Sequence, residues 1–139
     1  MSINVVYFSK TGHSKKLAEV IAQELSVLSK DLQETPTPQT SDLLFLVTGI
    51  YASKSAPEVL RLIDSLDPKI VPRVCLVTSS MGQTSPKTIR KLLEDKGVYV
   101  LPEEYRCKGS FLFLGKGHPT AQELTDAATF ARQIATKTF

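Results

Sequence analysis

Hydroxyl side chains crowd one short stretch near the start of the chain, Ser9 to Ser14. Its six residues read Ser-Lys-Thr-Gly-His-Ser, and they follow Ile3 to Phe8, whose β-branched and aromatic residues are typical of a buried strand. Behind the stretch, apolar residues recur at the spacing of one helix face: Leu17, Ile21, Leu25 and Leu28. A strand that feeds a helix through such a turn directs backbone N–H groups and the positive end of the helix dipole at one point. This pattern predicts a phosphate site.

Two common phosphate loops do not match this stretch. A Walker A loop needs a Lys-Ser/Thr pair directly after its last glycine, and here His13 follows Gly12. The dinucleotide fingerprint needs three glycines, and this loop has one. What remains is a loop whose hydroxyls surround the anion, or an ordinary turn in which a serine caps the helix.

The stretch resembles the Ser/Thr-x-Thr-Gly-x-Ser/Thr phosphate loop of flavodoxins, which also follows the first strand of the fold. In that family the loop holds the monophosphate of FMN. The resemblance therefore implies non-covalent FMN in this chain. On matching positions it implies that the phosphate is held by Ser9, Thr11, Gly12 and Ser14, and Lys10 and His13 are further candidate cofactor-binding residues of the same loop.

The rest of the chain alternates apolar strands with helices. Leu43 to Val47 and Val74 to Thr78 are apolar without alternation, which is typical of central parallel strands. Two capping boxes, Ser55 with Glu58 and Thr120 with Glu123, predict helix starts. Ser85 and Pro86 predict the start of a further helix, which Gly97 caps, and Asp31 to Thr35 are predicted to form a polar edge strand. The apolar positions that the helices are expected to bury are Val59 or Leu60, Ile63, Leu66, Ile89, Leu92, Leu93, Leu124, Ala127, Phe130, Ala131 and Ile134.

These elements predict one α/β domain over residues 1–139. The expected architecture is a flavodoxin-like three-layer sandwich, with a five-stranded parallel sheet of order 2-1-3-4-5 and helices on both faces. Two short apolar runs, Val98 to Leu101 and Phe111 to Leu114, allow either two strands or one interrupted strand region. Ligands of such sheets bind at the carboxyl ends of the strands.

Two further loops, Thr48 to Lys54 and Thr78 to Gln83, meet the first loop at that edge. Tyr51 is suited to cover a flat ring, although a half-buried loop tyrosine explains it equally well. The resemblance extends to the end of the chain, where Cys107 to Phe111, Gly117 to Thr120 and Ala127 to Ala131 look like the closing pattern of short flavodoxin-family proteins. It implies that the flavin ring is contacted by Ile50, Tyr51, Ala52, Ser79, Ser80, Met81 and Gly82.

The composition of the chain argues against several other classes of protein. The 139 residues carry a net charge of +3, with positive residues scattered among acids, so a nucleic-acid face is not expected. No apolar run has the length of a membrane span, and the start of the chain has no signal-peptide pattern, which predicts a cytoplasmic protein. The two cysteines, Cys75 and Cys107, are expected to be a core residue and a strand-end residue. No side-chain set for acid–base catalysis or metal binding falls on the three loops.

The resemblance implies an electron-transfer protein that carries one or two electrons between a reductase and an acceptor protein, as a monomer or weak dimer. Two alternatives stay open: an FMN-dependent NAD(P)H/quinone-type reductase, and a flavodoxin-like accessory domain without cofactor. The chain differs from the usual acidic carrier in its positive charge, its lack of tryptophan and Ala52 in place of a flexible glycine. These differences predict a weakly stabilised one-electron-reduced flavin and a raised reduction potential.

Overall fold

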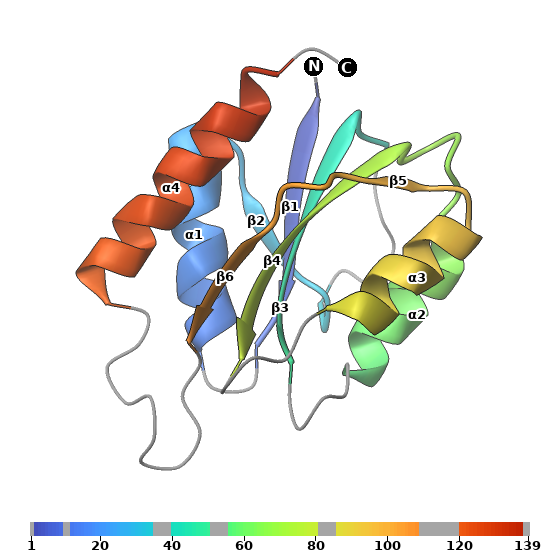
Figure 1. The fold of residues 1–139 in the computed structure, drawn as a ribbon, viewed down its shortest axis with the longest axis horizontal. Coiled ribbons are helices and arrows are strands. Elements are labelled where there is room, and N and C mark those ends of the chain that lie inside the picture. The colour runs from blue at the N-terminus through green and yellow to red at the C-terminus, as the bar shows by residue number, and fades with distance from the viewer. Residues whose placement is uncertain are drawn as a thin grey trace.

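The fold is a parallel sheet covered by helices on both faces (Figure 1). The computed structural model describes residues 2–9, 12–34, 40–50, 56–80, 86–108 and 120–137. In chain order, the elements are β1 (Ile3–Phe8), α1 (His13–Leu25), β2 (Ser29–Asp31), β3 (Leu43–Ile50), α2 (Pro57–Ser65), β4 (Arg73–Ser80), α3 (Lys87–Asp95), β5 (Tyr99–Val100), β6 (Tyr105–Lys108) and α4 (Ala121–Ala135).

All pairings between these strands are parallel, and their order is β2-β1-β3-β4-β5, with β6 also paired to β4. This confirms the predicted α/β flavodoxin-like architecture and strand order. A parallel connection needs a crossover, and each crossover helix covers one face of the sheet.

Two separate apolar clusters fill the space between the sheet and its helices. One lies under α1 and α4 and includes Leu17, Ile21 and Phe45; the other lies under α2 and α3 and includes Leu46 and Leu76. Neighbouring strand residues alternate between the clusters, because successive side chains point to opposite faces. The central segments of β3 and β4, Leu43 to Val47 and Val74 to Val77, are therefore apolar on both faces, as the sequence pattern predicts.

Helix α1 is shorter than its apolar spacing predicts. It ends at Leu25, where Ser26 adopts a left-handed conformation with φ 58° and donates its backbone N–H to Gln23. Leu28 lies beyond this turn with 81% of its surface exposed. The expectation that Leu28 extends the buried face of the helix was wrong, because the chain has already turned toward β2.

The helix starts at Ser55 and Ser85 were predicted one residue too early. Ala56 is the N-cap of α2 and Pro57 its first residue, which moves Glu58 out of the third position that a capping box requires. Pro86 is the N-cap of α3 rather than its first residue. By contrast, the Thr120–Glu123 capping box of α4 is confirmed: Glu123 N–H donates to Thr120 Oγ1 at 3.1 Å, and Thr120 N–H donates to Glu123 Oε1 at 2.8 Å.

The predicted buried positions of α2, α3 and α4 are buried with three exceptions: Leu92 is exposed, and Leu124 and Phe130 are only partly buried. Val59 rather than Leu60 faces the core of α2, and Leu60 is 39% exposed. On α3, Ile89 and Leu93 are buried, whereas Leu92 is 36% exposed. In both helices the spacing alone admitted either neighbour, and packing against the sheet selected one.

Both edges of the sheet differ from the sequence expectation. The edge strand β2 lies at Ser29–Asp31, upstream of the predicted Asp31 to Thr35, because β1 pairs Val5 with Ser29 and Tyr7 with Asp31. At the other edge, β5 and β6 pair different parts of β4 and are separated by residues 101–104. The fifth strand is therefore interrupted, and its second part lies in the stretch between the two apolar runs. The run Phe111 to Leu114 lies outside the described residues.

Within the described part of the chain, no helix is both long and apolar enough to cross a membrane.

Candidate flavin site

Four strands end together at one edge of the sheet, the lower edge in Figure 1. Phe8 of β1 pairs with Thr48 of β3, Thr48 pairs with Thr78 of β4, and Thr78 pairs with Arg106 of β6. The three predicted loops all begin at this row. The structure therefore brings together strand ends that are distant in sequence, at the place where parallel α/β sheets bind ligands.

The first loop closes through a side-chain hydrogen bond. Gly12 N–H donates to Ser9 Oγ at 2.8 Å, and Gly12 itself is left-handed, with φ 91° and ψ −5°. The Gly12 carbonyl then accepts the first backbone bond of α1, from Lys16 N–H at 3.1 Å. Because Ser9 uses its oxygen as an acceptor inside the loop, its O–H proton stays available to donate to a ligand.

Ser14 carries the clearest sign of a ligand at this loop. The residue is 1% exposed, and within the part of the chain that the structure describes its Oγ atom has no hydrogen-bond partner. Buried hydroxyls are nearly always satisfied, so an orphan one indicates a missing partner. Ser14 lies in the first turn of α1, whose N–H groups have no acceptor within the helix. The donor set is that of an anion site.

The electrostatics of the first turn of α1 favour an anion. The turn contains no acidic residue, although acidic residues are the usual complement to a helix N-terminus. Lys15 and Lys16 follow Ser14 directly, and both are exposed. A phosphate at this point would meet the positive end of the helix dipole and two nearby cations.

A Cβ atom built on Gly12 meets no heavy atom within 4 Å. The loop therefore leaves open space at Gly12, two residues before Ser14. Residues present at the loop fit a phosphate group: hydroxyl donors, backbone amides and room for the oxygens. His13 begins α1 and already has an interaction of its own, so the structure gives no reason to regard it as a proton-transfer group.

The second and third loops start later than predicted, because β3 extends to Ile50 and β4 to Ser80. Gly49 pairs with Ser79 and Ile50 with Ser80, so three predicted ring contacts, Ile50, Ser79 and Ser80, lie in strands rather than loops. Ser79 is 5% exposed. The extension has a physical cause, since each strand end is paired by a parallel neighbour.

Two buried threonines just inside this edge were not predicted as site residues. Thr48 and Thr78 pair with one another across β3 and β4 and are 0% and 1% exposed. Thr48 Oγ1 donates to the adjacent Gly49 carbonyl at 3.2 Å, and Thr78 Oγ1 has no partner among the described residues. In the sequence, the signal for these two residues was that a threonine follows each apolar run. Thr78 therefore places one unsatisfied buried hydroxyl near the end of β4.

The other predicted site residues lie outside the described part of the chain: Lys10, Thr11, Tyr51, Ala52, Met81 and Gly82.

Neither cysteine is suited to act as a nucleophile at this edge. Burial, followed by the charge of Glu123, raises the pKa of the Cys107 thiol to about 12. Burial is also the main cause that raises the pKa of Cys75 to about 12. Both thiols stay protonated near neutral pH. Cys107 lies in β6 opposite Ser79, as expected for a strand-end cysteine, and Cys75 is a core residue of β4.

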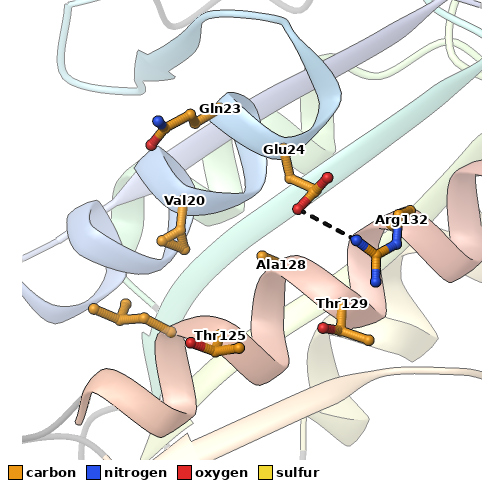
Figure 2. A pocket seen from close by; sticks show the side chains of 8 residues that line it. Val20, Gln23, Glu24, Thr125, Ala128, Thr129 and Arg132 are labelled. Carbon is orange, nitrogen blue, oxygen red and sulfur yellow. Dashed lines mark ion pairs between the residues drawn. The ribbon is translucent and has the colours of Figure 1, made fainter.

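An open groove of about 630 Å³ lies elsewhere, between α1 and α4 (Figure 2). Its charged groups, Glu24 and Arg132, already pair with one another at 3.8 Å across the groove. Small and polar side chains such as Thr125 and Ala128 make up much of the remaining lining. No group of three or more His, Cys, Asp or Glu side chains that could hold a metal occurs among the described residues. The groove therefore lacks convergent chemistry, unlike the first loop.

Comparison with known proteins identifies the fold and the family. A family model described as a flavodoxin domain matches residues 4–109. Among solved structures, the fold is similar to a short-chain flavodoxin associated with a non-canonical PDU bacterial microcompartment, with 17% identity, a TM-score of 0.70 and 97% of each chain covered. It is also similar to a flavodoxin from the domain Archaea, with 17% identity, a TM-score of 0.73 and coverage of 97% and 96%.

A third similar structure is the NAD(P)H:quinone oxidoreductase from Methanothermobacter marburgensis, with 12% identity, a TM-score of 0.68 and coverage of 96% and 98%. No curated protein sequence matches the chain. Identities this low show a shared fold and no more. The family model, however, covers most of the chain, including the first loop and the three strand ends. The chain therefore belongs to the flavodoxin family.

Proposed function

We propose that this protein binds FMN non-covalently at the carboxyl edge of the sheet and carries electrons between redox partner proteins. Membership of the flavodoxin family implies flavin binding. The buried Ser14 hydroxyl in the first turn of α1, which has no partner among the described residues, supports a phosphorylated flavin as the ligand. A phosphate oxygen would accept its proton and would also receive the N–H groups of that turn.

Each described residue of the first loop has a distinct part in this proposal. Gly12 lets the chain turn in a left-handed conformation without a side chain between loop and phosphate. Ser9 closes the loop by accepting from Gly12 N–H. Ser14 donates from below, and the dipole of α1 and the nearby lysines balance the phosphate charge. Thr11 and Lys10 remain proposed phosphate contacts by resemblance to the family loop.

The ring of the cofactor would lie over the ends of β3 and β4, where the second and third loops begin. We propose Tyr51 as its aromatic cover, and Ile50 and Ala52 as neighbours in the same loop. The stretch Ser79 to Gly82 would offer hydroxyl and backbone groups to the polar edge of the ring. When bound, FMN supplies the redox chemistry, accepting and releasing one or two electrons.

The absorption spectrum tests cofactor binding directly. Purified protein incubated with FMN and then desalted should keep the yellow colour of the flavin, with about one flavin per chain. Riboflavin, which lacks the phosphate, should be lost more readily on the same column. A protein that stays colourless with both would instead favour an accessory role without cofactor.

A second function, that of an FMN-dependent reductase, is supported by the fold shared with a protein described as an NAD(P)H:quinone oxidoreductase. Steady-state NAD(P)H oxidation by the FMN-loaded protein, with a quinone as acceptor, separates the two functions. A carrier should show negligible turnover until a separate reductase is added. Turnover by the isolated protein would identify it as the reductase.

A further inference from the structure

The strand β6 stabilises the part of β4 that leads into the third loop of the proposed flavin site. Residues Val77 to Ser80 of β4 pair with Tyr105 to Lys108 on this side and with β3 on the other. The two short pieces of the fifth strand are separated by residues 101–104, so β6 is not held in place by an unbroken strand (Figure 1). Its position depends on its own pairing with β4 and on contacts with the helices.

Arg90 of α3 binds the interruption at two points. Its Nη1 donates to the Leu101 carbonyl at 3.1 Å, and its Nη2 donates to Glu104 Oε2 at 2.8 Å. The two acceptors belong to the first and last residues of the break between β5 and β6. A planar guanidinium can bind both at once, which a lysine ammonium on a flexible stem cannot do with the same geometry.

Both partners of Arg90 lie in partly shielded surroundings. The Leu101 residue is 2% exposed, and the Glu104 side chain is 19% exposed. Glu104 has a second cation, Arg106, at 3.5 Å through its other oxygen. Loss of Arg90 would leave the Leu101 carbonyl without this donor and the Glu104 carboxylate with its more distant partner only.

On the opposite face, β6 is attached to α4 through Tyr105. The Tyr105 hydroxyl donates to the Glu123 carbonyl at 2.9 Å, and its ring lies 5.9 Å from the ring of Phe130. Arg90 therefore holds the residues that lead into β6 from the α3 side, while Tyr105 attaches β6 itself to α4. Between them, Glu103 is also held, because its carboxylate pairs with Lys137 and its carbonyl accepts from Cys75 Sγ. The Arg90 and Tyr105 contacts lie on opposite sides of the sheet, so neither can replace the other.

We propose that Arg90 is a positioning residue for the flavin site, which keeps β6 docked on β4 and so holds the base of the third loop in its binding geometry. The part that concerns the flavin rests on the function proposed above. The part that concerns β6 stands without it, and the two parts are tested separately.

The docking of β6 can be followed through the thiol of Cys107. This thiol lies on β6 and is part-buried. It should react slowly with a disulfide reagent such as DTNB while the strand is docked, because burial shields it and raises its pKa. Cys75 is left in place, because it is fully buried and donates to the Glu103 carbonyl within the break, and Cys107 labelling is read separately by peptide mass spectrometry. Arg90→Gln should speed the reaction of Cys107 in cofactor-free protein about tenfold. Arg90→Lys should give a smaller increase, because only one of the two acceptors is recovered.

The matched control is Arg61→Gln on α2. Arg61 also pairs with a glutamate, Glu58 at 3.3 Å, but its side chain is 73% exposed and does not contact the fifth strand in the described part of the chain. This variant should leave the Cys107 rate unchanged. If Arg90→Gln fails to fold, Glu104→Gln replaces it, since that change removes the charged partner and leaves the Leu101 bond intact.

Flavin affinities test the second part. Arg90→Gln should raise the dissociation constants of FMN and riboflavin by the same factor, about fivefold to tenfold, because the ring region is loosened and the phosphate loop is not. The ratio of the two constants should stay at the wild-type value. A merely structural effect on the whole fold would instead weaken the phosphate loop and change the ratio.

Three outcomes would overturn the proposal. An unchanged Cys107 rate in folded Arg90→Gln, or in folded Glu104→Gln where that variant takes its place, would show that β6 stays docked without the ionic contact. Faster labelling with unchanged flavin affinities would show that β6 does not support the site. A changed ratio would place the effect at the phosphate loop. If wild-type protein binds neither flavin, the proposed function fails, and the Cys107 rate still decides whether Arg90 holds β6.

Discussion

A buried hydroxyl without a hydrogen-bond partner, such as that of Ser14, is a cost to the free protein that a ligand can remove. The Ser14→Ala variant should therefore keep or slightly raise the melting temperature of the cofactor-free protein. The same change should raise the FMN dissociation constant about tenfold to hundredfold. This factor corresponds to the loss of a hydrogen bond to a charged group, which contributes about 1.5–3 kcal/mol. Quenching of flavin fluorescence measures the affinity.

Ser65→Ala provides the contrast for this prediction. Ser65 lies at the end of α2, away from the carboxyl edge, and its Oγ donates to the Leu62 carbonyl at 2.7 Å. Its loss should cost about 0.5–1.5 kcal/mol of stability and leave FMN affinity unchanged. Equal FMN affinities in wild type and Ser14→Ala would contradict the phosphate assignment.

Alanine substitutions at two glycines with left-handed backbone conformations can distinguish the effect of backbone strain from that of ligand contact. Gly12 has φ 91° and Gly97 has φ 85°, and each has room for a methyl group. Gly12→Ala and Gly97→Ala should therefore each lower the free energy of unfolding by about 1–2 kcal/mol, through the same strain. Only Gly12→Ala should also weaken FMN binding, because its methyl group would occupy open space in the proposed phosphate loop. Chemical denaturation and FMN titration measure the two effects, and equal losses of affinity in both variants would refute this assignment.

At the scale of elements, β6 is too short for sequence periodicity to predict it as a strand. Tyr105 and Cys107 alternate with charged residues, as in a half-exposed edge strand, but four residues are too few to decide on a strand. What makes them a strand is the free edge of β4 at Val77 to Ser80. Pairing with a neighbour also determines β2, because β1 pairs with Ser29 to Asp31, upstream of most of the predicted segment.

Burial around β6 also predicts how stability depends on pH. Tyr105, Cys107 and Cys75 each have a pKa raised to about 12, and burial is the main cause in each case. In the unfolded chain, thiols lose their protons near pH 9 and tyrosine near pH 10. The native state therefore binds more protons than the unfolded state between about pH 9 and pH 12, so stability must fall as pH rises through this window.

Urea unfolding at a series of pH values checks this expectation. The midpoint should fall progressively above about pH 9 in the wild-type protein. Cys107→Ala should make the fall less steep, whereas Thr125→Ala, a change at an exposed and non-titrating position of α4, should leave its slope unchanged. A rise in stability over this range would contradict the cause assigned to these pKa shifts.

At the scale of the whole molecule, cofactor binding should appear as added stability. A ligand that binds only the native state adds about 2.7 kcal/mol at a concentration one hundred times its dissociation constant. For a chain of 139 residues this corresponds to a rise in melting temperature of about 5–10 °C with FMN. At the same concentration, riboflavin should give a smaller rise, because it cannot use the donors at the start of α1.

Adenosine 5′-monophosphate is a suitable comparison ligand, since it carries a phosphate ester and no flavin ring. It should give little or no shift. Equal shifts with FMN and riboflavin would mean that the first loop does not bind the phosphate. Scanning calorimetry over a range of ligand concentrations supplies the measurement.

The sequence by itself determined the fold class and the first loop. Apolar strands without alternation require a sheet covered on both faces, and right-handed parallel crossovers leave few strand orders, so β2-β1-β3-β4-β5 follows from local pattern and general rules. The hydroxyl-rich stretch Ser9 to Ser14 needed no tertiary information, because strand, loop and helix are contiguous. The Thr120 capping box was equally local.

Only the tertiary structure decided which residues meet at a distance. The extension of β3 and β4 to Ile50 and Ser80, the interruption of the fifth strand, and the burial of Thr78 without a partner depend on neighbouring strands. The contact of Arg90 with Glu104 joins a helix to a strand break 14 residues later. Such pairings are set by packing and register, which involve the whole chain, whereas periodicity and capping report only on residues within a few positions of one another.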